Sequence, residues 1–170
     1  MKLLLFNIGL CCALIFWGYK EGYRLNVTPS LPKGIYQIAA ESPARGDIVA
    51  FCISGHAADL AREREYLQAG SCPNGLRPLM KYLAGVPGDW VDVTADGILS
   101  GPDGGIRGLW AALPQEQDRE GRLLFSSPFQ GKIPDGQALV LTSHKGGYDS
   151  RYFGLVPFDS LQKMKPVYTF

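Results

Sequence analysis

The pattern of apolar and polar positions divides the chain into one uninterrupted apolar run and a long region of short alternating runs. The apolar run covers residues 3–19, "LLLFNIGLCCALIFWGY", and contains no charged side chain. Its length is at the lower limit for a helix that crosses a membrane. Trp17 and Tyr19 stand where interfacial aromatic side chains are typical. No small-x-small cleavage site follows, so we expect residues 1–20 to form an uncleaved membrane anchor rather than a cleaved signal peptide.

Residues 21–170 are predicted to form one mainly β domain built on an antiparallel sheet. Short runs rich in Val, Ile, Tyr and Phe alternate there with Gly and Pro turns, which is typical of strands. A change of composition over 54–77 predicts a short helical insertion between strands. The expected strands lie at 34–40, at 46–53, at two places within 76–94, in a hairpin over 94–101 and at 136–143, with 151–161 closing the sheet, 20–27 as a linker and 100–131 as long loops.

Composition and charge narrow the function. The chain has 170 residues and a net charge of +1, which suits a single domain and gives no bias toward nucleic acid. Cys11 and Cys12 lie in the apolar run, while Cys52 and Cys72 lie in the β region. The second pair either forms a disulfide, which would imply an oxidising compartment, or remains two thiols. No cysteine–histidine spacing typical of a zinc site is present, so no metal is expected.

A candidate nucleophile lies in the stretch "NVTPSLPKGIY", residues 26–36. Ser30 stands between Pro29 and Pro32, and these prolines stiffen the backbone on both sides of its hydroxyl. Thr28 precedes Ser30 by two residues, so in an extended chain both side chains point to one face. The Thr28 hydroxyl and the Ser30 backbone N–H could then stabilise an oxyanion.

A nucleophilic serine needs a base, and the sequence offers two candidates. The first is a Ser30–His144–Asp149 arrangement, in which His144 lies in a Gly-rich loop. The second is Lys81 in "PLMKYLAGVPGD", which shares its strand face with apolar side chains. Burial among such side chains would lower the pKa of the lysine toward neutrality, so a Ser-Lys pair is the favoured interpretation.

The order of the segments resembles a known family. The stretches "PSLPKGIY", "RGDIVAF", "MKYLAGVPGD" and "YDSRYFGLVP" follow one another as in type I signal peptidases, which are membrane-anchored Ser-Lys endopeptidases with a mainly β fold. The compact length and the form "TPSLPKGIY" are most similar to the branch that serves conjugative DNA transfer, the TraF-type peptidases.

The resemblance implies roles for individual residues. Ser30 would attack the scissile carbonyl, Lys81 would take its proton, and Thr28 would supply an oxyanion donor. Asp149 would be a third catalytic residue, with Ser150 and Arg151 in support. General signal peptidases carry a serine two residues before this aspartate, where this chain has Gly147. We therefore expect Ser143, Asp149 or Ser150 to orient the lysine instead.

The resemblance also implies a function without cofactor or metal. The expected substrate is a membrane-associated pilin precursor, which the enzyme cleaves and in some relatives joins into a ring, alongside other conjugative transfer or type IV secretion components. It would bind as an added strand beside Leu31, Pro32, Leu79 and Met80, with the domain in the periplasm at the inner membrane. Two alternatives stay open: a general signal peptidase that removes leader peptides, and a non-catalytic assembly module.

Overall fold

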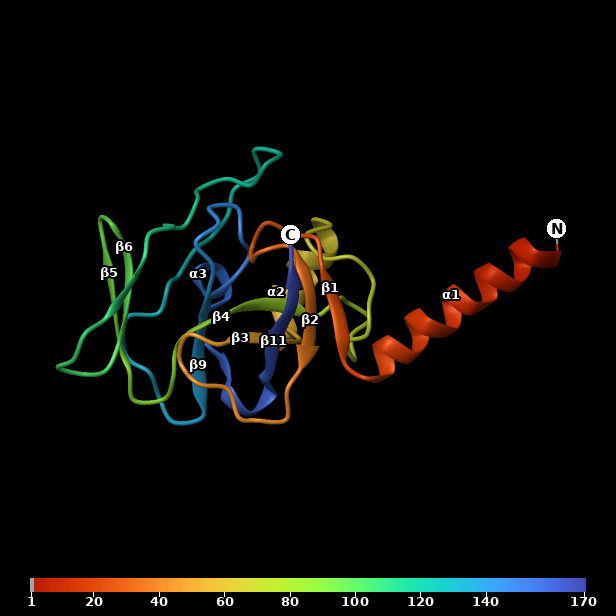
Figure 1. Cartoon of the computed structure of the whole chain (residues 1–170). Helices are drawn as coiled ribbons and strands as arrows, with labels where there is room; N and C mark the ends of the chain where they lie inside the picture. The colour runs from red at the N-terminus through yellow and green to blue at the C-terminus, as the bar shows by residue number, and fades with distance from the viewer. Residues whose placement is uncertain (1) are drawn as a thin grey trace.

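A computed structural model describes residues 2–170, with side chains from residue 5 onward, so Met1 of the predicted anchor lies outside the described residues. The chain forms two antiparallel sheets and a projecting N-terminal helix (Figure 1). The helices are α1 (Lys2–Lys20), α2 (Gly55–Glu63) and α3 (Ser150–Phe153), with a 3-10 turn at Phe158–Ser160. The strands are β1 (Tyr23–Asn26), β2 (Gly34–Ile38), β3 (Ile48–Phe51), β4 (Leu79–Gly85), β5 (Trp90–Thr94), β6 (Gly97–Gly101), β7 (Gly108–Trp110), β8 (Gly131–Lys132), β9 (Gln137–Leu141), β10 (Val156–Pro157) and β11 (Gln162–Thr169).

The helix α1 forms over the predicted apolar run and points away from the body of the protein (Figure 1). Its side chains are largely exposed, including Phe6, Ile15 and Trp17. In the described part of the chain, however, no helix is both long enough and apolar enough to cross a membrane. The predicted helix is therefore confirmed, whereas the predicted membrane-spanning segment is not.

The large sheet has seven strands in the order β1-β2-β11-β3-β4-β9-β10, and every neighbouring pair is antiparallel. The strand β4 lies between β3 and β9, and its alternate residues Leu79, Lys81 and Leu83 are buried. A strand covered on both faces can carry apolar residues at nearly every position. This explains why the sequence around Lys81 is apolar on both sides.

The chain end confirms one prediction in part. Residues 151–161 supply β10, the edge strand beside β9, but the rest of this range forms α3 and a 3-10 turn. The long strand β11 follows and lies between β2 and β3, far from either in sequence. Gly34 permits this pairing, since a Cβ there would come within 2.1 Å of the Tyr168 carbonyl oxygen.

The predicted linker 20–27 is also wrong in part. Residues Tyr23–Asn26 form β1, which pairs with β2 so that Leu25 lies opposite Ile35. Only Glu21 and Gly22 separate this strand from α1. The helix is therefore joined to the sheet by a tight turn and not by a flexible stalk.

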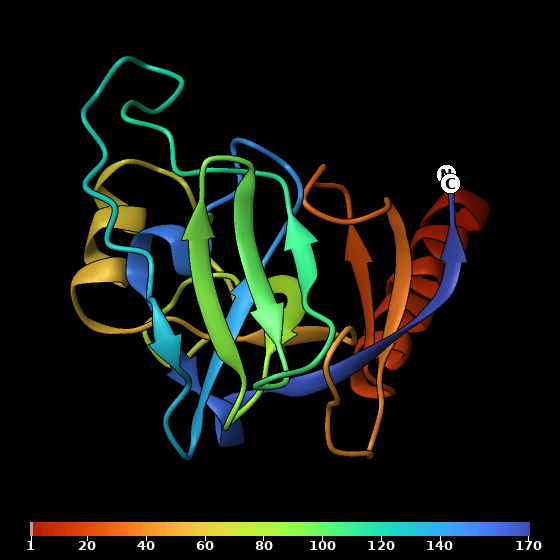
Figure 2. The same cartoon turned by 90° about the vertical axis from the view of Figure 1, so that its left-hand side faces the viewer.

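The two faces of the large sheet pack against different partners. On one face, Val140 and Leu83 belong to a core that also contains Ala58 and Ala61 of α2. On the other face, Leu139 and Leu141 belong to a core with the small sheet. The small sheet has the order β7-β6-β5-β8 and lies in front of the large sheet in Figure 2.

The predicted insertion contains α2, as expected, and a disulfide joins Cys52 to Cys72 with a Cα–Cα distance of 5.7 Å. This bond ties the insertion to the end of β3. The predicted loop region 100–131 is mostly irregular, but it includes β7, which pairs with β6, and an isolated bridge between Gln117 and Leu123.

Candidate active site

Ser30 lies in the connection between β1 and β2, and one buried side chain shapes this connection. The Asn26 amide nitrogen donates hydrogen bonds to the carbonyl oxygens of Thr28, Leu31 and Pro32 at 3.1, 3.2 and 3.1 Å. Its amide oxygen accepts from the Thr28 N–H at 3.2 Å. Asn26 thus replaces a regular turn with a loop wrapped around its own side chain, and Ser30 is held within it.

Lys81 reaches this loop from β4. Its side chain is 3% exposed, and its Nζ donates a hydrogen bond to the Ser30 Oγ at 2.9 Å across 51 residues of sequence. Burial lowers the pKa of Lys81 to about 8, while Asp149 raises it and Arg151 lowers it further. A lysine with such a pKa can release its proton near neutral pH and then accept one from the adjacent hydroxyl.

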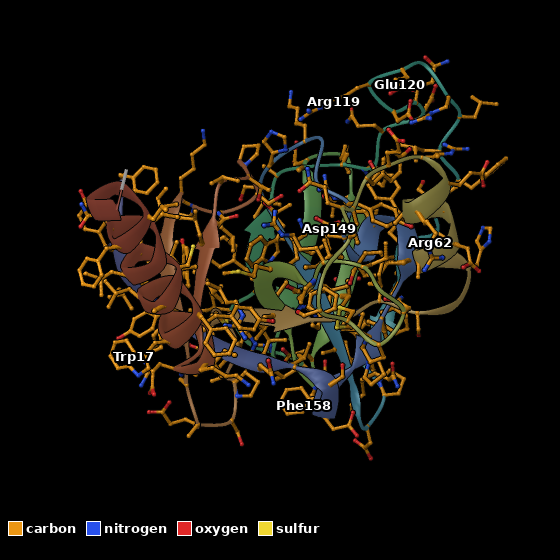
Figure 3. All side chains as sticks on the ribbon, turned by 90° about the vertical axis from the view of Figure 1, so that its right-hand side faces the viewer. Trp17, Arg62, Arg119, Glu120, Asp149 and Phe158 are labelled. Carbon is orange, nitrogen blue, oxygen red and sulfur yellow. A yellow bond between two sulfur atoms is a disulfide. The ribbon has the colours of Figure 1, made fainter. Side chains whose placement is uncertain are left out.

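Asp149 and Arg151 form a completely buried ion pair beside this centre, at the start of α3. The Asp149 Oδ1 accepts from the Arg151 Nε at 2.8 Å, and the guanidinium also donates to the carbonyl oxygens of His144 and Gly147, each at 3.0 Å. In Figure 3 the labelled Asp149 lies in the interior of the domain. Both carboxylate oxygens of Asp149 accept hydrogen bonds, so the ion pair is held in one arrangement.

Neither carboxylate oxygen of Asp149 is bonded to Lys81 or Ser30 in the described part of the chain. One oxygen is bonded to Arg151, and the other is shared between Arg151 and the Thr142 N–H. Asp149 therefore lies near the lysine without touching it.

The residues expected to orient Lys81 have other contacts. The buried Ser150 Oγ accepts from the Val140 N–H at 3.0 Å and so anchors β9. Ser143 is exposed. Across residues 5–170 the only hydrogen bond of the Lys81 side chain is the one to Ser30. The lysine is positioned by its place on β4, between β3 and β9.

The alternative arrangement of Ser30, His144 and Asp149 is not formed. In the described chain no hydrogen bond joins its side chain to Ser30 or Asp149, and its Nδ1 is buried without a partner. His144 contributes instead through its backbone N–H, which donates to Thr142 Oγ1 at 3.1 Å. The geometry favours the lysine over the histidine.

The predicted oxyanion donors differ in availability. The Thr28 hydroxyl donates to the Asn26 Oδ1 at 2.7 Å, so it would have to turn to serve an oxyanion. The Ser30 N–H donates to no protein group in the described residues. A free N–H beside a nucleophile is the arrangement that stabilises a developing oxyanion.

An open groove of about 1950 Å³ passes the Ser30 hydroxyl. It extends from Tyr19 on α1 to Arg119 and Glu120 on the loop between β7 and β8. In Figure 3 the labelled Trp17 lies on the helix, and the labelled Arg119 and Glu120 lie on the loop at the other side of the molecule. Two of the predicted substrate-binding residues, Leu79 and Met80, line the groove.

The other two predicted substrate-binding residues do not line this groove. Leu31 is 4% exposed and packs inside, because it follows a turn that points its side chain into the core. Pro32 is exposed, and its carbonyl accepts from the Tyr36 hydroxyl at 2.6 Å. Their part in the site is to fix the loop.

The start of β4 offers an open backbone edge in this groove. The pairing of β4 with β9 begins at Tyr82, opposite Leu141. Residues 79–81 pair with β3 on one side only. An extended peptide could add there as a strand. Among the described side chains, no group of three His, Cys, Asp or Glu could hold a metal ion.

Sequence similarity to known proteins identifies the family of this chain. The family model for signal peptidases, "Signal peptidase, peptidase S26", matches residues 2–163. The chain belongs to this family.

Within the family, the chain is similar to proteins of conjugal DNA transfer. It is 37% identical over 153 residues to the conjugal transfer protein TraF of Agrobacterium tumefaciens, covering 88% of this chain and 84% of that protein. It is 38% identical over 140 residues to the probable conjugal transfer protein TraF of Sinorhizobium fredii, covering 80% and 71%. It is 31% identical over 156 residues to a plasmid transfer protein TraF of Escherichia coli, covering 89% and 85%.

A crystal structure of a signal peptidase I from Enterococcus faecalis aligns with a TM-score of 0.42 at 22% identity, over 77% of this chain and all of that one. A likeness of this size supports no conclusion, and the family assignment depends on the sequence matches.

Two residues that matter for this site were not predicted from the sequence, namely Asn26 and Thr142. The Thr142 hydroxyl donates to the Ser30 carbonyl oxygen at 2.5 Å across 112 residues. For Asn26 one signal was available, since a small polar residue that ends a strand commonly bonds to the backbone of the following turn. For Thr142 no local signal exists, because its partner is distant in sequence.

Proposed function

We propose that this protein is a serine endopeptidase in which Ser30 is the nucleophile and Lys81 is the general base. The observation that carries the proposal is the 2.9 Å contact between the Lys81 Nζ and the Ser30 Oγ, made by a lysine whose pKa burial lowers to about 8. An amine with this pKa is neutral in a useful fraction of molecules near pH 8.

The reaction proceeds in two steps. Neutral Lys81 accepts the hydroxyl proton while the Ser30 Oγ forms a bond to the scissile carbonyl carbon. The oxyanion receives hydrogen bonds from the Ser30 N–H and from the Thr28 hydroxyl, which turns away from Asn26. The C–N bond then breaks, and the protonated lysine gives its proton to the leaving amine.

The acyl-enzyme that remains can be resolved by two nucleophiles. Water, deprotonated by Lys81, releases a linear product with a carboxylate end. An amine of the precursor itself, attacking in the same way, releases a ring and no water is consumed. The buried Asp149–Arg151 pair lies beside the lysine and acts on its pKa in opposite directions, since Asp149 raises it and Arg151 lowers it.

The proposed substrate is a pilin precursor of a conjugative transfer system. Support comes from the TraF proteins that the chain resembles, which are described as conjugal or plasmid transfer proteins. The open edge at residues 79–81 would pair with an extended segment of the precursor. Other components of the transfer system would be its partners, without contact to DNA.

We place the enzyme at the inner membrane with its β domain in the periplasm. The exposed apolar side chains of α1 support membrane attachment, and the Cys52–Cys72 disulfide is typical of an oxidising compartment. Recovery of the chain in the cytosolic fraction with free Cys52 and Cys72 thiols would contradict this placement.

The test is co-expression with the candidate pilin precursor, followed by mass spectrometry of the product. Ser30→Ala and Lys81→Ala should each leave the precursor intact, while Ser143→Ala, which changes an exposed serine nearby, should process it normally. A cyclic product weighs one water less than the linear one. Processing of unrelated leader peptides would point to a general signal peptidase, and normal transfer with Ser30→Ala would point to a non-catalytic module.

A further inference from the structure

Thr142 contacts the main chain of the nucleophile, whereas the lysine contacts its side chain. It follows β9 directly, its side chain is 1% exposed, and its hydroxyl donates to the Ser30 carbonyl oxygen at 2.5 Å. Ser30 is thus held at two points, by Lys81 at its Oγ and by Thr142 at its main chain. The two contacts together fix the direction of the Ser30 hydroxyl, whereas a single contact would leave the residue free to rotate.

Thr142 is itself held by the buried ion pair. Its N–H donates to the Asp149 Oδ2 at 3.0 Å, and its Oγ1 accepts from the His144 N–H at 3.1 Å. The Thr142 hydroxyl donates its hydrogen bond to the Ser30 carbonyl and accepts one from the His144 N–H, so it has one orientation. A continuous path of hydrogen bonds therefore leads from Arg151 through Asp149 and Thr142 to Ser30.

Gly147 leaves room for this threonine. A Cβ at position 147 would come within 2.2 Å of the Thr142 Cγ2 and within 3.1 Å of the Arg151 guanidinium. The methyl of Thr142 thus fills the space that any side chain at position 147 would need. The glycine at this position, where general signal peptidases carry a serine, is explained by steric exclusion.

We propose that Thr142 is a positioning residue, through which the buried Asp149–Arg151 pair orients the Ser30 main chain, and that Gly147 is required to accommodate it. The inference depends on the proposed function, because positioning matters only if Ser30 reacts. It accounts for an aspartate that is close to the site but bonded to neither Ser30 nor Lys81. Asp149 is linked to the nucleophile by hydrogen bonds through Thr142, whereas it acts on the base only by its electrostatic effect on the pKa of Lys81.

The first experiment compares Thr142→Val, which keeps the shape and removes the hydroxyl, with Thr142→Ser, which keeps the hydroxyl. We expect Thr142→Val to lower kcat for precursor cleavage about 10²-fold, since a misaligned reacting group costs this much. KM and the pKa of the pH–rate profile should not change, because the groove and Lys81 are untouched. Thr142→Ser should restore most of the rate.

The matched control is Thr94→Val in the small sheet, where the threonine hydroxyl likewise donates to a carbonyl oxygen, that of Gly97, at 3.0 Å. It should leave kcat unchanged. If Thr142→Val loses thermal stability to the same extent as Thr94→Val but keeps the wild-type kcat, Thr142 is only structural and the inference is overturned. Equal losses of kcat in Thr142→Val and Thr142→Ser would overturn it too.

The second experiment tests Gly147. Gly147→Ala should reduce kcat, and adding Thr142→Ser, which removes the clashing methyl, should recover part of it. Such a recovery is a coupling that independent sites do not show. A fully active Gly147→Ala variant contradicts the inference.

Failure of the inference can be told from failure of the proposed function. An inactive Ser30→Ala enzyme together with a fully active Thr142→Val enzyme overturns the role of Thr142 alone. A Ser30→Ala enzyme that still cleaves the precursor overturns both.

Discussion

The two sheets of this protein differ in what they bury. Around the start of β4 and the end of β9, the large sheet encloses polar and charged side chains, namely Asn26, Lys81, Thr142, Asp149, Ser150 and Arg151. Among the described residues of the strands β5 to β8, the only buried polar side chain is Ser100, whose hydroxyl donates to the Ala84 carbonyl oxygen at 2.7 Å. The ionic contact on that sheet, between Arg107 and Asp92, is half-exposed.

Burying charge costs free energy. The different numbers of buried polar side chains therefore distinguish the sheet that contains the candidate site from the sheet that only supports it. A buried ion pair rarely stabilises more than a well-packed apolar core would, and a buried lysine must be desolvated. The small sheet avoids both costs and supplies apolar contacts such as Val91 and Ile98. The large sheet accepts both costs around Ser30, whereas the buried Asp89, between β4 and β5, is paired with the more exposed Arg45.

The largest expected effect comes from breaking the buried pair. Asp149→Asn leaves the fully buried Arg151 without a counter-charge, and we expect the free energy of unfolding to fall by about 3–5 kcal/mol. The matched substitution Asp92→Asn in the small sheet should cost less than about 1 kcal/mol. Urea unfolding of both variants measures the contrast, and equal losses would remove the distinction between the sheets.

Replacing the buried lysine should raise the free energy of unfolding, whereas breaking the ion pair should lower it. Because the pKa of Lys81 is about 8 in the folded chain and ordinary in the unfolded chain, the unfolded state binds more protons between about pH 8 and 10. Wild-type stability should therefore rise with pH across this window.

Lys81→Met should remove activity and, at pH 7, raise the free energy of unfolding by on the order of 3 kcal/mol. The gain should shrink toward pH 10, where the wild-type lysine is neutral in both states. Thermal unfolding at the two pH values tests this; a less stable Lys81→Met variant at pH 7 would show that the lysine does not carry a desolvation cost.

The third expected effect concerns rate. Cleavage should increase about tenfold per pH unit below pH 8 and level off above it, since the reactive form has neutral Lys81. A pH–rate profile from pH 6 to 10 measures it. A midpoint near the ordinary pKa of histidine would return His144 to consideration.

The smallest expected effect is at the contact between the sheets. Ser100→Ala removes the bond to Ala84 and should cost about 1–3 kcal/mol of unfolding free energy, because a buried carbonyl loses its partner. Activity in the folded enzyme should be unchanged. A clear loss of kcat would mean that the small sheet also shapes the site.

Much of the fold could be predicted because strand periodicity is local. The apolar run around Lys81 and the turns beside β2, β3, β5 and β6 identify strands from short windows. The strand β11 could not be recognised in this way, since it contains Pro166 and is mostly exposed. It is a strand because β2 and β3 supply hydrogen-bonding partners on both sides.

The residues of the site also differ in whether the local sequence reveals them. Ser30 and Lys81 could be proposed from the chemistry of their neighbours and from a family resemblance. Thr142 could not, because its hydroxyl matters only through a partner 112 residues away. Asn26 was missed for a related reason: its stretch was interpreted as a linker, so the end of β1 and the loop around its amide were not expected.

The tight turn between α1 and β1 fixes the distance from the N-terminal helix to Ser30. The turn has two residues, the Gly22 carbonyl accepts from the Ile38 N–H at 3.1 Å, and the Arg24 guanidinium stacks 4.0 Å from the Tyr19 ring centre. The helix end and the Ser30 hydroxyl thus keep a constant separation. With the proposed membrane attachment of α1, a substrate anchored at the same membrane would present one peptide bond to Ser30. Inserting a flexible Gly-Ser segment after Glu21 should make that separation variable and yield products cut at several neighbouring bonds.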